Sequence, residues 1–165
     1  MKSCWRADPS AKHALEMEPV APRFYKGELP CFAIFRTEGG LELTPAARDR
    51  VLARCLEEHG TRYALFAAVV MADHTHLVLQ ALHPERGWPF DLKSILVSLM
   101  ESSALAVRKV LGGKGPVWQE ETFTVELRSQ ETLDSKCEFV RQNPVRSQVV
   151  KTPEDYSWLW LSARM

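Results

Sequence analysis

The chain has 165 residues, 45% of them hydrophobic and 25% charged, a size and composition typical of one globular domain. It contains 21 basic and 21 acidic residues, so net charge gives no reason to expect nucleic-acid binding, which must depend on a local patch. The sequence has no run of about 18 apolar residues and no apolar leader, so we expect neither a membrane span nor secretion. Four scattered cysteines predict reduced thiols in a cytoplasmic protein.

Residues 1–24 predict an arm without regular structure, because they contain three prolines and no sustained hydrophobic period. Residues 25–165 are expected to form a single domain. Its first strand is predicted over 30–40, where apolar and small residues alternate until they meet a Gly-Gly turn. A helix is predicted over 43–60, with Thr44 as its N-cap, a proline at the first helical position and a glycine as its stop.

The middle of the chain predicts a hairpin followed by a long helix. The β-prone segments 63–72 and 74–82 meet at Ala72-Asp73, which predicts a turn although it is not of the glycine type. The helix is predicted over 90–113, with an aspartate near its start and two glycines at its end.

The last third of the chain predicts a strand and then a helix. The strand is expected over 117–129, and the helix over 129–143, with Ser129 as its N-cap and Pro144 as its end. The order is therefore β-α-β-β-α-β with one further helix. This order predicts an α+β fold of the split βαβ or ferredoxin-like type: an antiparallel sheet with helices on one face, plus the C-terminal helix.

Two histidines stand one residue apart in the second hairpin strand. Side chains two apart on a strand share a face, so His74 and His76 can chelate one divalent cation. The alternative is that both are ordinary half-exposed strand residues, because two ligands are too few for tight binding. Asn143 offers a third ligand, and its amide oxygen would favour a hard cation such as Mg²⁺ or Mn²⁺. Asn143 also suits a simple turn role before Pro144.

Four segments together resemble a known family: "MADHTHLVLQ", "VWQEETFTVELRSQETL", "FVRQNPVRSQVV" and "PEDYSWLW". In this order and spacing they resemble the REP-associated branch of the single-strand tyrosine transposases, the insertion-sequence type with an HUH motif. The resemblance spans roughly residues 24–160. It implies a ferredoxin-like fold and metal-dependent nicking and joining of single-stranded DNA folded into hairpins.

The resemblance also implies roles for individual residues. His74 and His76 would hold the divalent cation, and Asn143 on the catalytic helix would supply the third ligand. A tyrosine one turn before that ligand would be the nucleophile, but this chain has Phe139 there, whose ring carries no hydroxyl. Thr75 also departs from the pattern, which has a bulky hydrophobe, and this change should weaken strand packing.

Loss of the nucleophile leaves three functions open. The protein is a transposase-like nicking enzyme with another nucleophile, a hairpin-binding module without covalent chemistry, or a metal-binding protein whose partner is not nucleic acid. Metal-activated water is a further route to strand hydrolysis. The only tyrosines are Tyr25, Tyr63 and Tyr156, and none lies on the predicted catalytic helix. The resemblance implies a monomer or a homodimer.

DNA binding requires cations for phosphates and flat rings for unstacked bases. The first candidates for phosphate contacts are Arg141 and Arg146, with Lys136 and Arg128 nearby. A second basic cluster is expected at the end of the long helix, and a third in the arm: Arg108, Lys109 and Lys114; Lys2, Arg6 and Lys12. The candidate stacking rings are Trp118, Phe123, Trp158 and Trp160, most of which are expected in the core.

Overall fold

The structure is a computed structural model that describes residues 22, 29–84, 87–88 and 90–163. Lys2, Arg6 and Lys12 of the predicted arm, and Tyr25 directly after it, lie outside these residues. The βαββαβ order expected from the sequence is present. Its elements are β1 (Cys31–Arg36), α2 (Pro45–Glu57), β2 (Tyr63–Val70), β3 (His74–Ala81), α3 (Leu92–Leu111) and β4 (Phe123–Glu126). They are followed by α4 (Gln130–Arg141), α5 (Asn143–Arg146), a 3₁₀ turn (Pro153–Asp155) and β5 (Leu159–Leu161).

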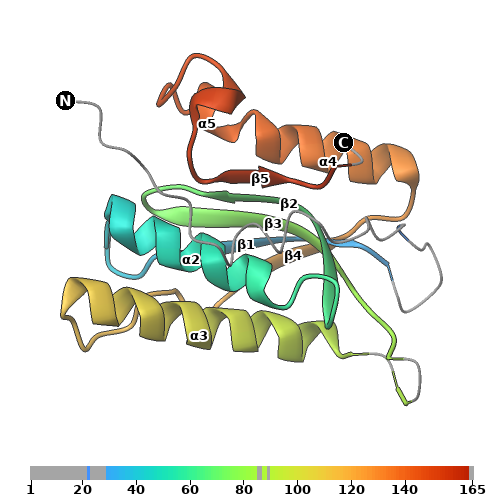
Figure 1. The fold of residues 1–165 in the computed structure, drawn as a ribbon, viewed down its shortest axis with the longest axis horizontal. Helices are drawn as coiled ribbons and strands as arrows, with labels where there is room; N and C mark the ends of the chain where they lie inside the picture. Colours follow the sequence, from blue (N-terminus) through green and yellow to red (C-terminus); the bar gives the residue numbers. More distant parts are fainter. Residues whose placement is uncertain (1–21, 23–28, 85–86, 89, 164–165) are drawn as a thin grey trace.

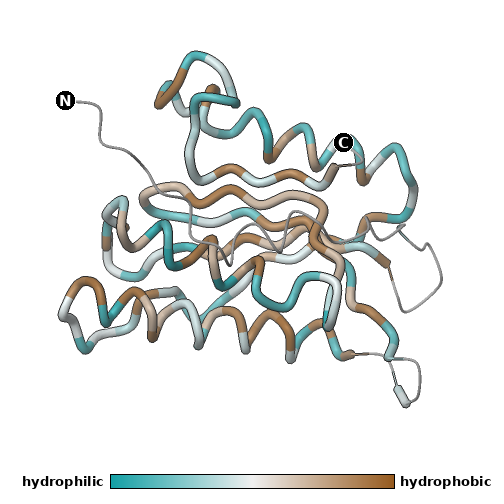
Figure 2. Tube along the Cα trace, viewed as in Figure 1, coloured by the Kyte–Doolittle hydropathy of each residue, from teal (hydrophilic) through white to brown (hydrophobic). Residues whose placement is uncertain are grey.

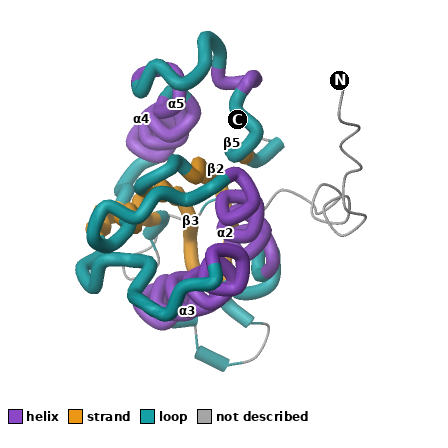
Figure 3. The backbone as a smooth tube through the Cα atoms, turned by 90° about the vertical axis from the view of Figure 1, so that its left-hand side faces the viewer, coloured by secondary structure: helices purple, strands orange, loops and turns teal. Residues whose placement is uncertain are grey.

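The strands form one five-stranded antiparallel sheet in the order β4-β1-β3-β2-β5. Helices α2 and α3 pack against one face of this sheet, and α4 lies on the other, as Figures 1 and 3 show. The sequence predicted helices on one face plus a C-terminal helix, and it left the position of that last helix undetermined. The structure places α4 opposite the other two, so the sheet is the middle of three layers.

Each face of the sheet has its own apolar core. One core joins the strands to α2 and α3, and the other joins them to α4. Figure 2 shows the hydrophobic residues running along the central strands, while the helices alternate between hydrophobic and hydrophilic positions. β2 is buried along its whole length, since it lies inside the sheet with helices on both faces.

A β-bulge interrupts the alternation of side chains along β2. Leu65 pairs with Leu79 and Ala67 with Val78, so Phe66 has no partner of its own on β3. As a result Phe66 and Ala67 both belong to the core beneath α4. Beyond the bulge the two strands are again in step.

Local signals fix the ends of the helices much as predicted. Thr44 caps α2 by accepting a hydrogen bond from the Ala47 amide, and Asp91 caps α3 in the same way through Ser94. Ser129 and Thr132 form a reciprocal capping box at the start of α4. These three predicted helix starts are confirmed.

Three boundaries differ from the prediction. The strand expected over 117–129 is reduced to β4, and Trp118 makes only an isolated bridge to Thr37. α4 ends at Arg141, and the predicted stop, Pro144, lies instead inside the short helix α5. The aromatic tail, for which no strand was predicted, supplies β5 at the edge of β2.

No helix in the described part of the chain is both long enough and apolar enough to cross a bilayer. Three of the cysteines, Cys31, Cys55 and Cys137, are buried free thiols. Burial raises the pKa of Cys31 to about 11 and that of Cys55 to about 12, which keeps both thiols protonated and unreactive.

Candidate functional site

The two histidines lie on the face of the sheet that α4 covers. Their ring centroids are 4.7 Å apart with the planes at 65°. Thr75, between them, is fully buried and points to the opposite face. The predicted shared face of His74 and His76 is therefore observed.

Asp73 orients the first of these rings. Its carboxylate Oδ1 lies 2.6 Å from Nδ1 of His74. When Nδ1 carries the proton and donates a hydrogen bond to Asp73, the lone pair of Nε2 is free to bind a cation, which is how metal-binding imidazoles are commonly held. Sequence reasoning assigned Asp73 only to the turn, although its place directly before the histidine was a usable signal.

His76 is held neutral. It is only 6% exposed, and its pKa is lowered to about 3 by burial first, and then by the charges of His74, Arg146, Arg36 and Lys136. A neutral imidazole can act as a metal ligand, whereas a protonated one cannot. Its Nδ1 atom is buried without a hydrogen-bond partner among the described residues.

Asn143 leaves a second polar atom unpaired. It is 7% exposed, and its Oδ1 has no hydrogen-bond partner in the described part of the chain. Such atoms are rare in folded proteins and indicate a missing water or ion. α5, which begins at Asn143, lies on the same side of the sheet as α4 (Figure 3). The described residues contain no group of three or more His, Cys, Asp and Glu that could hold a metal. A cation site here would therefore need the amide oxygen of Asn143 as well as the two imidazoles.

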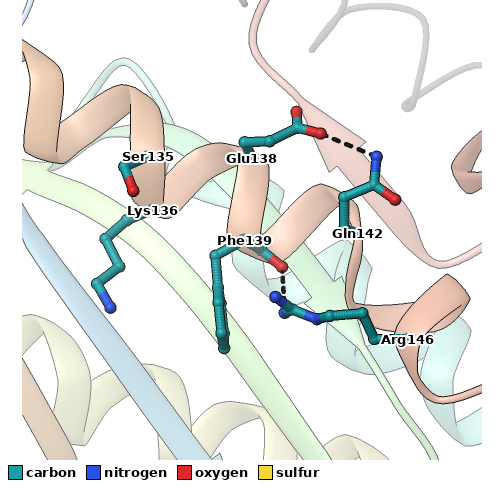
Figure 4. A pocket seen from close by; sticks show the side chains of 6 residues that line it. All are labelled: Ser135, Lys136, Glu138, Phe139, Gln142 and Arg146. Atoms are coloured by element: carbon teal, nitrogen blue, oxygen red, sulfur yellow. Dashed lines mark hydrogen bonds between the residues drawn. The ribbon is translucent and has the colours of Figure 1, made fainter.

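Phe139 lies on α4 directly over the second histidine. Its ring centroid is 5.7 Å from that of His76 and 5.8 Å, edge-on, from that of Phe32. The Arg146 guanidinium stacks on the ring at 3.8 Å, and the Lys136 ammonium lies 5.2 Å from its centroid. Figure 4 shows Lys136, Phe139 and Arg146 pointing to the same side of the helix.

The break between α4 and α5 explains the position of Arg146. Arg146 donates a hydrogen bond of 2.8 Å to the carbonyl of Phe139, in the last turn of α4. Carbonyls at a helix end lack intrahelical donors, and a basic side chain from the next turn is a common substitute. The interaction holds the guanidinium against the aromatic ring.

These side chains surround a hollow of about 280 Å³. Its lining residues are Ser135, Lys136, Glu138, Phe139, Gln142 and Arg146. Glu138 is engaged by Gln142 at 2.8 Å and by Arg141 at 3.2 Å. Lys136 and Arg146 form no ion pair with any described carboxylate, so their charges remain available to an anion.

The other two predicted phosphate contacts are already paired with acids. Arg141 lies 3.2 Å from Glu138 and 2.5 Å from Glu154, and these carboxylates, Glu154 foremost, raise its pKa. Arg128 lies 3.6 Å from Glu126. The predicted basic set is thus divided between Lys136 and Arg146 at the histidines and two arginines that neutralise carboxylates.

Arg36 is a cation that sequence reasoning missed. It pairs with His74 in the register of β1 and β3, so it lies on the same face. No sequence signal revealed it, because the register of two distant strands is not encoded locally. The predicted cluster at the end of α3, which includes Arg108 and Lys109, lies on the opposite face of the sheet.

Neither described tyrosine is positioned to act as a nucleophile at the candidate site. Tyr63 is fully buried and donates to the Cys55 carbonyl at 2.8 Å, and Tyr156 donates to the Val70 carbonyl at 2.8 Å. Burial raises the pKa of both phenols. Both belong to the apolar cores.

The four candidate stacking rings separate by burial. Trp118 is buried and donates to Ser103 Oγ at 2.9 Å, while Trp158 and Trp160 are half-buried against the core. Phe123 alone among them is exposed.

No protein-family model matches the chain, and no curated protein matches it either. Among solved structures, a REP-associated tyrosine transposase bound to a REP hairpin matches with a TM-score of 0.62 at 16% identity, covering 87% of this chain and 82% of that one. The chain shares the fold of that transposase. A crystal structure of a proposed transposase from Deinococcus radiodurans R1 matches with a TM-score of 0.47 at 18% identity, covering 74% of this chain and 96% of that one. The α+β fold with a five-stranded antiparallel sheet and helices matches the fold of the first of these structures.

Proposed function

We propose that this protein is a transposase-like protein that binds hairpin or single-stranded DNA and does not form a covalent phosphotyrosine link. The observation that carries the proposal is the arrangement around Phe139. A ring without a hydroxyl lies over the neutral imidazole of His76, between two cations that have no described acidic partner.

The cations suit a phosphate. Lys136 and Arg146 flank the hollow, and Arg36 lies on the same face beside His74. Phosphates are the groups that such lysines and arginines bind in DNA, and they supply most of the affinity. A neutral chain can bind DNA through such a patch. The relative with the same fold was solved bound to a REP hairpin, which makes folded single strands the first DNA to test.

We further propose that His74, His76 and Asn143 hold a divalent cation, Mg²⁺ or Mn²⁺. Support comes from the unpaired Nδ1 of His76, the unpaired Oδ1 of Asn143 and the carboxylate that orients His74. A bound cation would polarise a phosphate oxygen and stabilise charge that develops on the phosphodiester. The residues of the chain position the DNA: Lys136 and Arg146 bind the phosphate, and the ring of Phe139 excludes water from His76.

The first experiment uses a labelled DNA hairpin with a single-stranded tail and Mn²⁺. We expect a gel shift without strand cleavage and without a covalent adduct. His76→Ala is expected to weaken Mn²⁺ binding, measured by titration. A covalent adduct with the parent protein would contradict the proposal, and Mn²⁺ titrations identical for parent and variant would contradict the cation site.

Phe139→Tyr tests the site more sharply. The new phenol oxygen would bond to phosphorus while the bond from phosphorus to the departing sugar oxygen breaks, so we expect a covalent adduct and a nick. Phe139→Leu is the matched control, because it changes the same position without adding a hydroxyl, and we expect no nick. A Phe139→Tyr protein that binds DNA and Mn²⁺ but never nicks would contradict this assignment of the catalytic helix.

A second function remains in view because the chain has no net charge. A metal-binding protein whose partner is a small molecule or another protein needs no basic surface. Such a protein would bind Mn²⁺ through the same residues but would not shift hairpin DNA even at low salt, where phosphate contacts are strongest.

A further inference from the structure

The face of the sheet that carries the histidines is only partly covered by helices in the described residues. α4 packs on β2 and β3 and reaches β5, but it makes no packing of that extent against β1 or β4. All four residues of β4 are exposed. The side chains of β4 on this face therefore lie beside the candidate site with no described helix over them.

The strand register places Phe123 in line with the second histidine. Phe123 pairs with Ile34, and Ile34 pairs with His76. Residues directly opposite each other in an antiparallel sheet share a face, so these three side chains form one row across three neighbouring strands. With strands about 4.8 Å apart, Phe123 lies roughly 10 Å from His76.

Phe123 is 57% exposed, an unusual position for a large ring on a strand. Val125, on the same face, and the half-buried Ile34 extend the apolar surface around it. Single exposed apolar residues are ordinary. This ring differs because it continues the row that leads to the histidine site.

The charges that the strands themselves place on this face suit a nucleic acid. β1, β3 and β4 place no carboxylate on this face, because Glu126, opposite Cys31, points to the other one. Arg36 lies on this face, and the Lys136 ammonium is 5.0 Å from the Phe32 ring on β1. Single-stranded DNA is bound in this way, by flat rings for the bases beside cations for the backbone.

We propose that Phe123 stacks on an unpaired base of the DNA strand whose phosphate lies at Lys136 and Arg146. This inference rests on the proposed function and adds the place where a base is held. The patch consists of one ring and two aliphatic neighbours, which is much smaller than a protein–protein interface. A single base covers such a patch, and stacking tolerates any sequence because every base has a π-face.

The test measures affinity and stacking separately in the full-length protein. Fluorescence anisotropy with a tailed DNA hairpin gives the affinity. We expect Phe123→Ala to weaken binding roughly 5- to 100-fold, as for the loss of one stacked base. Phe123→Leu keeps the apolar bulk without the flat ring and is expected to lose nearly as much, while Phe123→Trp is expected to retain parental affinity.

2-Aminopurine placed in turn at each unpaired position of the hairpin reports stacking directly. The parent protein is expected to quench one position strongly, and Phe123→Ala is expected to relieve that quenching. Leu105→Ala is the matched control: Leu105 is 51% exposed on α3, on the opposite face of the sheet, and its variant should bind as the parent does. Phe123 is exposed, so its substitution should cost little stability, and thermal unfolding checks this.

The outcomes distinguish the two proposals. If the parent binds the hairpin and Phe123→Ala binds equally well, the stacking proposal is wrong while hairpin binding stands. If Phe123→Leu binds like the parent, apolar contact without a flat ring is enough to explain the affinity, and the stacking proposal is again wrong. If the parent does not bind the hairpin at all, the proposed function fails, and the stacking proposal fails with it.

Discussion

At the scale of single residues, Asp73 is the clearest addition to what the sequence indicated. Its carboxylate accepts a hydrogen bond from Nδ1–H of His74 and so leaves Nε2 as the nitrogen that can bind a cation. An acid that is 69% exposed contributes little to stability. Its effect should therefore appear in cation binding and not in folding.

We expect Asp73→Ala to weaken Mn²⁺ binding roughly 10- to 100-fold, which is usual for the loss of a carboxylate that supports a liganding histidine. Asp73→Asn, which still accepts a hydrogen bond, should weaken it less. The Mn²⁺ electron paramagnetic resonance signal measures the free ion. Glu101→Ala, which removes an acid from α3 on the other face, should have no effect. Equal affinity for the parent and Asp73→Ala would show that the carboxylate does not support the imidazole.

The sequence predicted the candidate ligands more readily than their surroundings. His74 and His76 follow from the two-residue period of a strand. Arg36 and Asp73 do not, because one depends on the pairing of β1 with β3 and the other on the rotamer of a turn residue. The stacked pair of Arg146 and Phe139 depends on a helix break that the sequence suggested only through Pro144.

At the scale of elements, β3 places a polar hydroxyl group, that of Thr75, on a face that is packed in the apolar core. Thr75 is fully buried between Phe35 of β1 and Val70 of β2, and its Oγ1 has no hydrogen-bond partner among the described residues. A buried unsatisfied hydroxyl costs about 1–3 kcal/mol. The missing bulky hydrophobe led us to expect weaker strand packing at Thr75, and the unpaired hydroxyl adds a second reason to expect a loss of stability there.

Thr75→Val should therefore raise the free energy of unfolding by about 1–2 kcal/mol, because valine keeps the shape and removes the unpaired group. Urea denaturation measures the change. Thr124→Val, at an exposed position of β4, is the control and should stay within about 0.5 kcal/mol of the parent. A loss of stability in Thr75→Val would mean that the hydroxyl has a partner, such as a buried water.

Elements with strong local signals were predicted well. The hydrophobic periods and N-caps of α2, α3 and α4 are local and survive in the structure. β5 was missed because its three residues pair only with β2, far away in the chain. The strand around Trp118 was predicted too long for a related reason. Trp118 is buried and donates a hydrogen bond to Ser103 of α3, and its segment does not continue the strand pairing of the sheet.

At the scale of the whole molecule, acid should destabilise the fold through a buried histidine outside the candidate site. His59 is buried, and its Nδ1 accepts a hydrogen bond of 2.9 Å from the Leu65 amide. Burial lowers the pKa of His59. The unfolded chain therefore takes up this proton before the folded one does, so stability falls as the pH drops below about 6.5.

We expect the free energy of unfolding to fall more between pH 7.5 and pH 5.5 in the parent than in His59→Gln. Glutamine keeps an acceptor for the Leu65 amide but does not titrate. Urea denaturation at the two pH values, without added metal, measures the difference. His76 is present in both proteins, so its titration contributes equally to both pH dependences and cancels in the comparison. Equal losses would show that His59 remains accessible to protons in the folded state.

At this scale the sequence predicted the order of helices and strands along the chain, but not which face of the sheet each helix covers. The sequence indicated βαββαβ and a further helix, since each element has its own period. It could not indicate that α4 lies opposite α2 and α3, because the side of a sheet to which a helix returns depends on packing between distant residues such as Val140 and Phe66.

The bulge in β2 has a consequence for how the chain tolerates changes in length. Phe66 and Ala67 occupy one pairing position between them, so losing either residue would leave every other side chain of the strand on its present face. A deletion at any other point of β2 would instead move each side chain beyond it to the opposite face of the sheet. Side chains that now pack under α2 and α3 would then point at α4, and the reverse. The strand thus has one place where its length can shorten while both of its surfaces are kept.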